Sequence, residues 1–281
     1  MNPVPAREPT AVTLDLDGVE LNVLVAGEGE PVLLLHGFPD SAQLWRKITP
    51  ALTAAGYQVI APDQRGFGRS AAPQGVRHYT IKQIVRDAIA VLDRLQIERA
   101  KLVGHDWGAV IGWSLAGAHG HRFERYAALS VGHPRAYAAA GLEQKLKAWY
   151  VLAFQLPGLA ETVFGAADFA LFRAFMGGHP ELDHWIADLK RPGRLTAALN
   201  WYRANFPKLV SPGFPRVQIP VMGVWSERDQ ALAEDQMVNS AAYVDGPFRY
   251  ERLARIGHWM PLDAPDPLAA LLLDFFGSSQ N

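Results

Sequence analysis

Five short apolar runs, separated by longer segments with helical periodicity, constrain the fold of this 281-residue chain most strongly. The runs are rich in Val, Ile and Leu without polar alternation, and they cover residues 31–37, 57–63, 100–106, 126–132 and 219–226. Such continuous hydrophobicity is typical of strands buried on both faces, because helices cover both sides of a parallel sheet. The alternation of strands and helices predicts βαβ crossovers and therefore an α/β fold with a mostly parallel sheet.

Three further segments refine this prediction. Residues 80–96 place apolar side chains at i, i+3, i+4 and i+7, which predicts an amphipathic helix with Thr80 as its N-cap. Residues 13–27 alternate in polarity and contain an Asp-Gly pair, which predicts an antiparallel hairpin at the edge of the sheet. The apolar segment 268–276 is too short to cross a bilayer and is expected to form a buried terminal helix.

Strand-like runs are missing between about residue 135 and residue 215, where helical periodicity and many aromatic side chains replace them. We therefore expect a helical cap at residues 135–215, inserted into an α/β core formed by residues 1–134 and 216–281. Folds of this kind bind ligands at the carboxyl ends of their parallel strands, so an insertion there is expected to line a pocket. A helical subdomain with an aromatic core of its own is the alternative.

Composition excludes several classes of partner. Lys and Arg number 27 and Asp and Glu number 28, so no basic excess indicates nucleic acid or an anionic membrane surface. The absence of cysteine excludes disulfides and thiolate metal sites, and the histidines show no metal-ligand spacing, so no metal or cofactor is expected. The first residues lack the layout of a signal peptide, and no apolar run reaches the ~18 residues of a membrane span. We expect a cytoplasmic monomer or homodimer.

The segment GHDWGA (104–109) places a carboxylate on a sharp turn between a predicted strand and a predicted helix. This is the context of the nucleophile elbow, whose central residue is usually Ser. The flanking glycines leave room for a tight turn, and the N-terminus of the helix that follows favours an anion. Asp106 is therefore the candidate nucleophile, and a glycine-rich turn with Asp as a helix N-cap is the alternative.

Two more polar residues complete the chain order nucleophile, acid, base that this elbow requires. Asp229 follows the apolar run at 219–226, and His258 lies in a Gly-His-Trp loop ahead of the last helix. Both positions lie past strand ends, where an α/β sheet gathers catalytic groups. His258 is the candidate base that activates a water molecule, and Asp229 is the candidate residue that orients it.

Two loops after predicted strands contribute further candidates. The segment HGFP (36–39) is expected to form an oxyanion hole from the backbone N–H of Phe38 and that of Trp107, with a cis bond before its proline. Asp63 and Arg65, in the next loop, are interpreted as residues that fix the loop itself. His133 follows a predicted strand, and we expect it to line the pocket.

The segments HGFP, DQRGFGRS, GHDWGA, SERD and GHW together resemble the α/β-hydrolase fold, and within it the epoxide hydrolase and haloalkane dehalogenase branch. The resemblance spans nearly the whole chain. An Asp nucleophile suits this branch, because its attack on a saturated carbon gives an ester that water can still cleave. A Ser nucleophile would give an ether instead. The sequence therefore predicts an epoxide or an alkyl halide as the substrate.

Two tyrosines of the expected cap separate these substrates. Each lies on a predicted apolar helix face: Tyr150 with Leu142, Leu146 and Ala153, and Tyr202 with Leu195, Leu199 and Phe206. An apolar helix face by itself favours the interpretation that both tyrosines belong to a hydrophobic core. The patterns WYxxxFQxPGxAE and NWYR resemble those of epoxide hydrolases, and this resemblance implies that Tyr150 and Tyr202 grip the epoxide oxygen. We predict that a small apolar epoxide and water give a vicinal diol through an alkyl ester of Asp106.

A haloalkane or haloacid dehalogenase that uses the same Asp106 is the alternative, since the indole of Trp107 could hold a halide. Haloalkane dehalogenases commonly carry Asn where this chain has Phe38, and fluoroacetate dehalogenases usually carry Arg where it has Trp107. Trp149 and Trp201 are the other candidate halide donors, but helical geometry turns them about 100° from the neighbouring tyrosines. A non-catalytic, ligand-sensing member of the fold is a third possibility.

Overall fold

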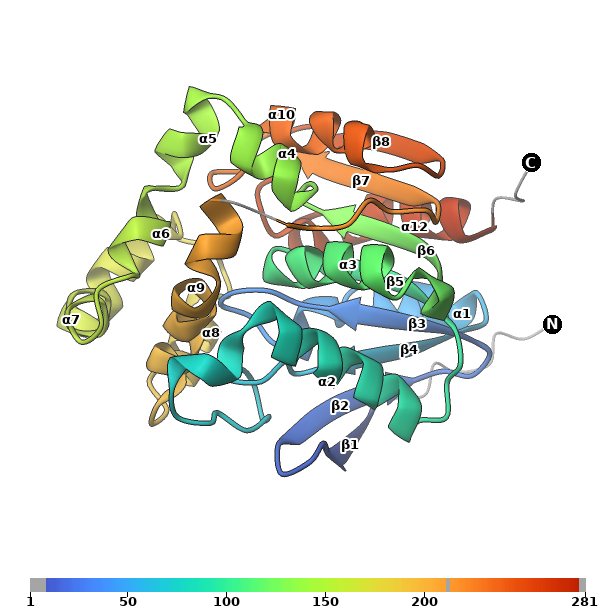
Figure 1. Ribbon diagram of the computed structural model, residues 1–281. Helices are drawn as coiled ribbons and strands as arrows, with labels where there is room; N and C mark the ends of the chain where they lie inside the picture. The colour runs from blue at the N-terminus through green and yellow to red at the C-terminus, as the bar shows by residue number, and fades with distance from the viewer. Residues whose placement is uncertain (1–8, 211–212, 278–281) are drawn as a thin grey trace.

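The strands form one eight-stranded sheet in the computed structural model, which describes residues 9–210 and 213–277 (Figure 1). The strand order is β1-β2-β4-β3-β5-β6-β7-β8. The strands are β1 (Thr10–Asp15), β2 (Glu20–Ala26), β3 (Glu30–Leu35), β4 (Tyr57–Pro62), β5 (Ala100–His105), β6 (Phe123–Leu129), β7 (Val221–Ser226) and β8 (Phe248–Leu253).

The pairing of these strands confirms the predicted α/β fold. β1 and β2 form the expected antiparallel hairpin at one edge, β2 runs antiparallel to β4, and every pair from β4 to β8 is parallel. The five apolar runs correspond to β3–β7. β8 was not predicted, because an edge strand is only half-buried and its sequence, FRYERL, alternates charged and apolar residues.

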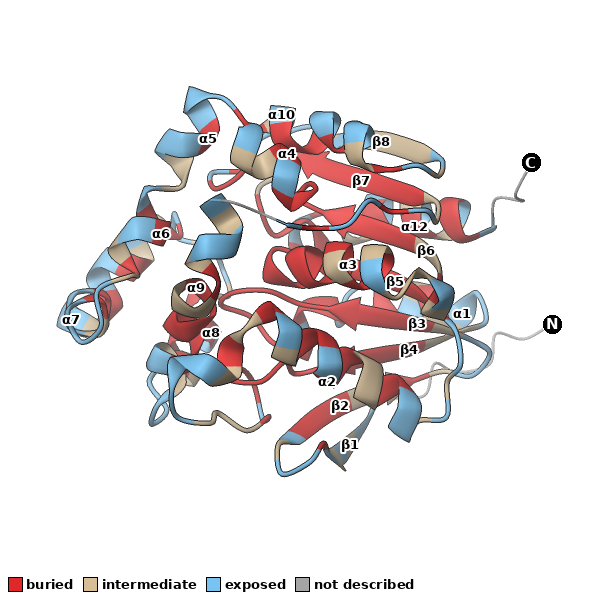
Figure 2. Ribbon diagram, viewed as in Figure 1, coloured by how far each residue is buried: buried red, intermediate tan, exposed pale blue. Residues whose placement is uncertain are grey.

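Helices cover both faces of the sheet (Figure 1). α2 (Ile81–Arg94) and α3 (Trp107–Ala118) pack together on one face, while α1 (Thr49–Ala54) and α12 (Pro265–Gly277) lie on the other. As predicted, the side chain of Thr80 caps α2. The strands β3 to β7 and helix α3 are mostly buried (Figure 2). Shorter elements complete the core: α10 (Glu234–Val238), α11 (Met260–Asp263) and the 3₁₀ turns Ala42–Trp45, Val76–Tyr79, Gly120–Arg122 and Asn239–Tyr243.

The segment between β6 and β7 is helical in its described residues. It contains α4 (Pro134–Ala139), α5 (Leu142–Lys147), α6 (Trp149–Ala153), α7 (Leu159–Phe175), α8 (Leu182–Leu189) and α9 (Arg194–Val210). α5 to α9 lie beside the carboxyl ends of the parallel strands, at the left of Figure 1. Within residues 9–210 and 213–277, no helix is long and apolar enough to cross a membrane.

The structure corrects the single apolar face predicted around Tyr150. The helix breaks at Ala148, so α5 and α6 have separate axes and the i, i+4 periodicity does not continue between them. Leu142 and Leu146 consequently project into solvent, with 71% and 66% of their surface exposed, whereas Tyr150 is buried. Figure 2 shows α5 as largely exposed. Burial of Tyr150 therefore comes from packing under the helical segment and not from a continuous helix face.

Candidate active site

Asp106 occupies the turn between β5 and α3 with φ of 54° and ψ of −121°, a strained conformation for a residue with a Cβ. Nearby backbone atoms leave no room for a side chain at the two glycines that flank Asp106. A Cβ at Gly108 would lie 1.9 Å from the carbonyl oxygen of Leu35, and one at Gly104 would lie 2.3 Å from that of Gly108. The turn thus presents the Asp106 carboxylate at the N-terminus of a twelve-residue helix, which favours its negative charge.

Backbone N–H groups hold one oxygen of this carboxylate. The N–H of Phe38 donates to Asp106 Oδ1 at 2.7 Å, and the backbone N–H of Trp107 also bonds to the carboxylate. The peptide bond that follows Phe38 is cis, as the sequence predicted. Burial raises the pKa of Asp106, although the charge of His258 and the two N–H groups oppose this shift. Phe38, one of the two residues expected to form an oxyanion hole, therefore donates to Oδ1, whereas Oδ2 is the oxygen that lies 3.8 Å from Nε2 of His258.

His258 and Asp229 lie on the other side of Asp106. Nδ1 of His258 is 2.8 Å from Oδ2 of Asp229, and its Nε2 is 3.8 Å from Oδ2 of Asp106. The other Asp229 oxygen accepts the backbone N–H groups of Ala231 and Leu232 at 2.9 Å each. Asp229 therefore orients the imidazole so that Nε2 faces the candidate nucleophile.

Asp106, Asp229 and His258 are buried together, and their charges shift one another's pKa values. Burial raises the pKa of Asp229, but the charge of His258 and the hydrogen bonds to its oxygens outweigh burial and hold the pKa below its usual value. Burial lowers the pKa of His258, but Asp229 and then Asp106 outweigh it, so the pKa of His258 is raised. Asp229 stays ionised at neutral pH, and His258 is poised to take up a proton.

His105 has a place in this cluster that the sequence analysis did not assign. Its Nε2 lies 2.9 Å from the carbonyl oxygen of His258. Burial, followed by the nearby charge of His258, lowers the pKa of His105 to about 3, so His105 is neutral and can donate to that carbonyl. A polar residue at the end of a fully buried strand was the available signal. His105 thereby fixes the loop that carries His258.

Helix α5 fixes the loop that carries Asp229. The amide of Gln144 donates to the carbonyl of Ala231 at 3.0 Å and accepts from the N–H of Ala233 at 2.9 Å. Nζ of Lys147 donates to the carbonyl of Asp229 at 2.7 Å. The sequence did not reveal these contacts, because about 85 residues separate the partners along the chain.

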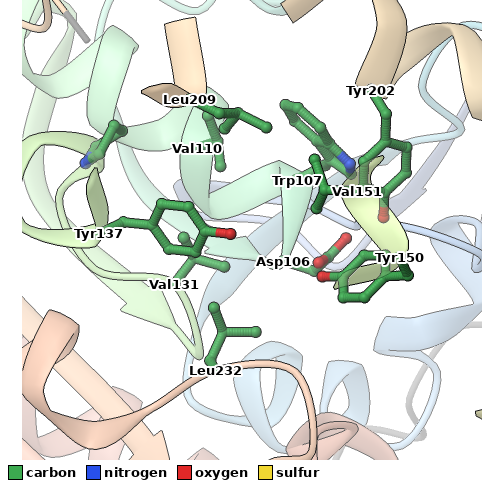
Figure 3. A pocket seen from close by; sticks show the side chains of 11 residues that line it. Asp106, Trp107, Val110, Val131, Tyr137, Tyr150, Val151, Tyr202, Leu209 and Leu232 are labelled. Atoms are coloured by element: carbon green, nitrogen blue, oxygen red, sulfur yellow. The ribbon is translucent and has the colours of Figure 1, made fainter. Parts of the chain in front are cut away.

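Tyr150 on α6 and Tyr202 on α9 lie over Asp106 (Figure 3). Both are buried, and their ring centroids are 6.0 Å apart. Burial raises the pKa of each tyrosine well above 10, and the charge of Asp106 adds to the shift. Both phenols therefore keep their protons and can donate hydrogen bonds to an oxygen placed between them and Asp106.

A narrow cavity extends from Asp106 in two directions, and both arms share Asp106, Tyr150 and Tyr202. The first, here named the α4 arm, is completed by Trp107, Val110, Val131, Pro134, Tyr137, Val151, Leu209 and Leu232. The second, here named the Trp259 arm, is completed by Phe38, Phe175, Met176, Gln230, Ala231, His258 and Trp259. This apolar lining around a few convergent polar groups is typical of a site for a small organic molecule.

Asp63 and Arg65 fix the conformation of the loop that carries them, as the sequence predicted. Asp63 accepts the backbone N–H groups of Ala42 and Arg69 at 2.8 Å each. Arg65 forms a buried ion pair with Asp87. Neither side chain lines the two arms of the cavity.

The expected position of His133 in the pocket is wrong. His133 is fully buried behind α4, where its Nδ1 caps the helix by accepting the N–H of Arg135. Its Nε2 lies 3.1 Å from the carbonyl oxygen of Pro215, and its ring stacks on that of Tyr243. The neighbouring Pro134 lines the α4 arm instead, since one residue of helix turns the chain from the core to the cavity.

Comparison with known proteins agrees with this geometry. Residues 30–265 match the model of a family described as having the alpha/beta hydrolase fold. The chain belongs to the α/β-hydrolase family. Epoxide hydrolase A of Mycobacterium tuberculosis is 33% identical to this α/β hydrolase, and the alignment covers 95% of the chain and 97% of that relative.

Other proteins similar to this α/β hydrolase are also named epoxide hydrolases. Human epoxide hydrolase 4 is 29% identical, with 92% of this chain and 76% of the relative covered. The crystal structure of epoxide hydrolase A from Mycobacterium thermoresistibile superimposes with a TM-score of 0.81 at 31% identity, covering 97% and 100% of the two chains. The resemblance to the epoxide hydrolase branch that the motifs indicated is therefore confirmed.

Proposed function

We propose that this α/β hydrolase opens a small epoxide and releases a vicinal diol through a covalent ester of Asp106. One observation carries the proposal: two buried, protonated tyrosines lie over a carboxylate whose Oδ1 accepts the backbone N–H of Phe38 and whose Oδ2 lies 3.8 Å from Nε2 of His258. The relatives named epoxide hydrolase support the same reaction. Residues 135–215 act as a cap over the core formed by residues 1–134 and 216–281.

The first step forms the ester. Oδ2 of Asp106 attacks one carbon of the epoxide, and the bond between that carbon and the ring oxygen breaks. The electron pair of that bond becomes an alkoxide on the neighbouring carbon. The O–H groups of Tyr150 and Tyr202 donate to this oxygen as its charge develops, which stabilises the transition state in a site with little water.

The second step cleaves the ester. Nε2 of His258 takes a proton from a water molecule, whose oxygen attacks Cγ of Asp106. The negative charge of the tetrahedral intermediate forms on Oδ1, which already accepts the N–H of Phe38, and the N–H of Trp107 also bonds to this carboxylate. Collapse of the intermediate breaks the bond between Cγ and Oδ2 of Asp106, so Oδ2 leaves with the substrate carbon. The proton on His258 passes to Oδ2, and the second proton of the water passes from the new carboxyl group to the alkoxide oxygen. These transfers give the diol and restore the Asp106 carboxylate.

The three indole groups considered as halide donors, those of Trp107, Trp149 and Trp201, do not favour a dehalogenase. The indole N–H of Trp201 donates to the carbonyl of Arg65 at 3.1 Å, and Trp149 is 47% exposed. The side chain of Trp107 hydrogen-bonds the hydroxyl of Tyr202 and opposes the rise in the pKa of that tyrosine. A halide at Asp106 would need two free N–H donors, whereas the cavity presents tyrosine hydroxyls that suit an alkoxide.

A parallel assay tests the proposal directly. The purified protein is incubated with styrene oxide and, separately, with 1-bromobutane, and diol and bromide release are measured. We expect diol from the epoxide and little bromide from the bromoalkane. Bromide release with no diol would contradict the proposal and establish the dehalogenase. Thermal stabilisation by both compounds without turnover would indicate a ligand-sensing protein.

Removal of the tyrosine hydroxyls is expected to slow ester formation. The single variants Tyr150→Phe and Tyr202→Phe should each reduce the alkylation rate by about 10-fold or more, and the double variant by about 10³-fold, because the developing alkoxide loses its donors. Rapid-quench measurement of the ester in a single turnover reports this rate. Tyr57→Phe makes the same chemical change at a half-buried position at the start of β4, which does not line the cavity, and should leave the rate unchanged. A double variant at full rate would remove both tyrosines from the mechanism.

Ester hydrolysis is expected to become faster as pH rises through the pKa of His258, because only the neutral imidazole accepts a proton from water. The Asp229 carboxylate raises that pKa, so Asp229→Asn should move the midpoint to lower pH. The plateau rate should also fall by about 10²-fold or more, since the imidazole loses its orienting partner. Single-turnover rates between pH 5 and 9 measure both effects.

Asp263→Asn is the matched control for this pH dependence. Asp263 raises the pKa of His258 through its charge alone and to a smaller extent than Asp229. The midpoint should therefore shift in the same direction by less, with the plateau retained. Equal midpoints in wild type and Asp229→Asn would exclude His258 as the titrating base.

A further inference from the structure

We propose that Tyr137 selects epoxides that carry a hydrogen-bond acceptor, such as an ether oxygen, on the substituent that enters the α4 arm. The inference rests on the proposed epoxide hydrolysis and adds a substrate class to it. Tyr137 belongs to α4, ahead of the helices that carry Tyr150 and Tyr202, and the family resemblance implied no role for it.

Tyr137 forms the part of the α4 arm that faces Asp106. In Figure 3 its ring enters the cavity on the side opposite Tyr150 and Tyr202, and its hydroxyl points toward Asp106. Apart from the indole of Trp107 and the shared catalytic side chains, the residues that line this arm have hydrocarbon side chains. The hydroxyl of Tyr137 is therefore placed to meet the substituent of a bound epoxide and not its reacting ring.

The partners of Gln144 leave it one amide proton that it can donate to the hydroxyl of Tyr137. The oxygen of the Gln144 amide accepts the N–H of Ala233, and its nitrogen donates one proton to the carbonyl of Ala231. The second proton of that nitrogen remains for Tyr137, and hydrogen bonding to Gln144 lowers the pKa of Tyr137, as donation to a phenolic oxygen does. The hydroxyl proton of Tyr137 is then free to be donated to a ligand.

Tyr137 also keeps that proton at physiological pH. Burial, followed by the charge of Asp106, outweighs the effect of Gln144 and raises the pKa of Tyr137 to about 12. A protonated phenol that already accepts from Gln144 recognises hydrogen-bond acceptors. An ether or carbonyl oxygen in the α4 arm would satisfy it, whereas a methylene group at the same place would leave it without a partner.

Backbone hydrogen bonds at the base of α4 fix the main chain of Tyr137. The N–H of Tyr137 donates to the carbonyl of His133 at 3.0 Å, and the N–H of His133 donates to Oγ of Ser240 at 2.7 Å. A donor that is already oriented loses little freedom on binding, so most of its hydrogen bond contributes to affinity. One such bond corresponds to a change of about 3- to 10-fold in affinity or in kcat/KM.

Four epoxides of equal length test the proposal: 1,2-epoxyoctane and its analogues with an ether oxygen at position 4, 5 or 6. We expect Tyr137→Phe to reduce kcat/KM about 3- to 10-fold for at least one ether analogue, mainly through a higher KM. The same variant should hydrolyse 1,2-epoxyoctane at least as well as wild type. Comparing the variant with wild type for each compound cancels differences in the intrinsic reactivity of the four epoxides.

Tyr243→Phe is the matched control. Tyr243 stacks on His133 at 4.7 Å beside the base of α4 but does not line the α4 arm, so this variant should show no preference among the four compounds. Equal losses on all four epoxides with Tyr137→Phe would mean a structural role and overturn the proposal. The absence of a selective loss at any ether position would overturn it as well.

Failure of epoxide hydrolysis itself would be visible separately, as no diol from any of the four compounds with wild type. Binding of octane-1,2-diol and its three ether analogues, measured by calorimetry, then tests Tyr137 without turnover. Weaker binding of at least one ether diol to Tyr137→Phe, by about 3- to 10-fold and without loss for octane-1,2-diol, would support the proposal. Equal affinities for wild type and variant would contradict it.

Discussion

Asp106→Ala is expected to reduce kcat/KM for an epoxide by about 10⁴-fold or more, because no other group can form the ester. Diol formation with a good substrate such as styrene oxide measures the loss. The variant should unfold at a temperature no lower than wild type. Burial raises the pKa of Asp106, which means that the ionised side chain destabilises the folded protein, and alanine removes that cost.

Isotope labelling checks that Asp106 acts as a nucleophile and not as a base. In a single turnover in ¹⁸O-labelled water, the new oxygen of the first diol should come from the Asp106 carboxylate and carry no label. The label should instead appear in the enzyme, on the peptide that contains Asp106. A labelled diol from the first turnover would show that water attacks the epoxide directly and would exclude the ester.

His258→Gln is expected to trap the ester, because ester formation needs Asp106 and the tyrosines but hydrolysis needs a base. Turnover should fall by about 10³-fold or more, while intact-mass analysis shows nearly all of the protein heavier by the mass of one epoxide. Glutamine is chosen because its amide can still donate to Oδ2 of Asp229, whose charge would otherwise be buried without its partner.

The double variant Asp106→Ala/His258→Gln is the control for this trap and should show no added mass. Peptide mapping of the single variant should place the adduct on Asp106. Full turnover by His258→Gln would exclude His258 as the base. An adduct on another residue would instead show that Asp106 is not the nucleophile.

Local motifs explain why much of the fold could be predicted. The run before Asp106 contains the apolar core Leu102-Val103 because every residue of β5 is buried, and the two glycines mark places where backbone atoms leave no room for a Cβ. These features can be recognised in a short stretch of sequence, although the backbone that excludes a Cβ at Gly108 belongs to Leu35, far away in the chain. β8 was not predicted because its alternating charged residues reflect its position at the edge of the sheet. Which strand lies at the edge depends on the tertiary structure.

Long-range packing explains what could not be predicted around the cavity. Tyr137 and Tyr150 belong to different helices, and only the break at Ala148 turns Tyr150 inward while Leu146 faces solvent. His133 and Pro134 are adjacent in sequence, yet one caps a helix in the core and the other lines the α4 arm. Amphipathic periodicity assumes a straight helix, and it fails where short helices change direction.

By itself, the sequence determined the α/β architecture and the chemical identity of the candidate nucleophile, acid and base, because strand hydrophobicity and the residue types of a tight turn can be recognised in short stretches of sequence. The tertiary structure decided how these groups face one another. It places Nε2 of His258 3.8 Å from Oδ2 of Asp106 and the N–H of Phe38 on Oδ1. It also brings Tyr137 to the opposite wall of the cavity. Distances between residues far apart in the chain follow from how the helices between β6 and β7 pack onto the sheet, and no local pattern encodes them.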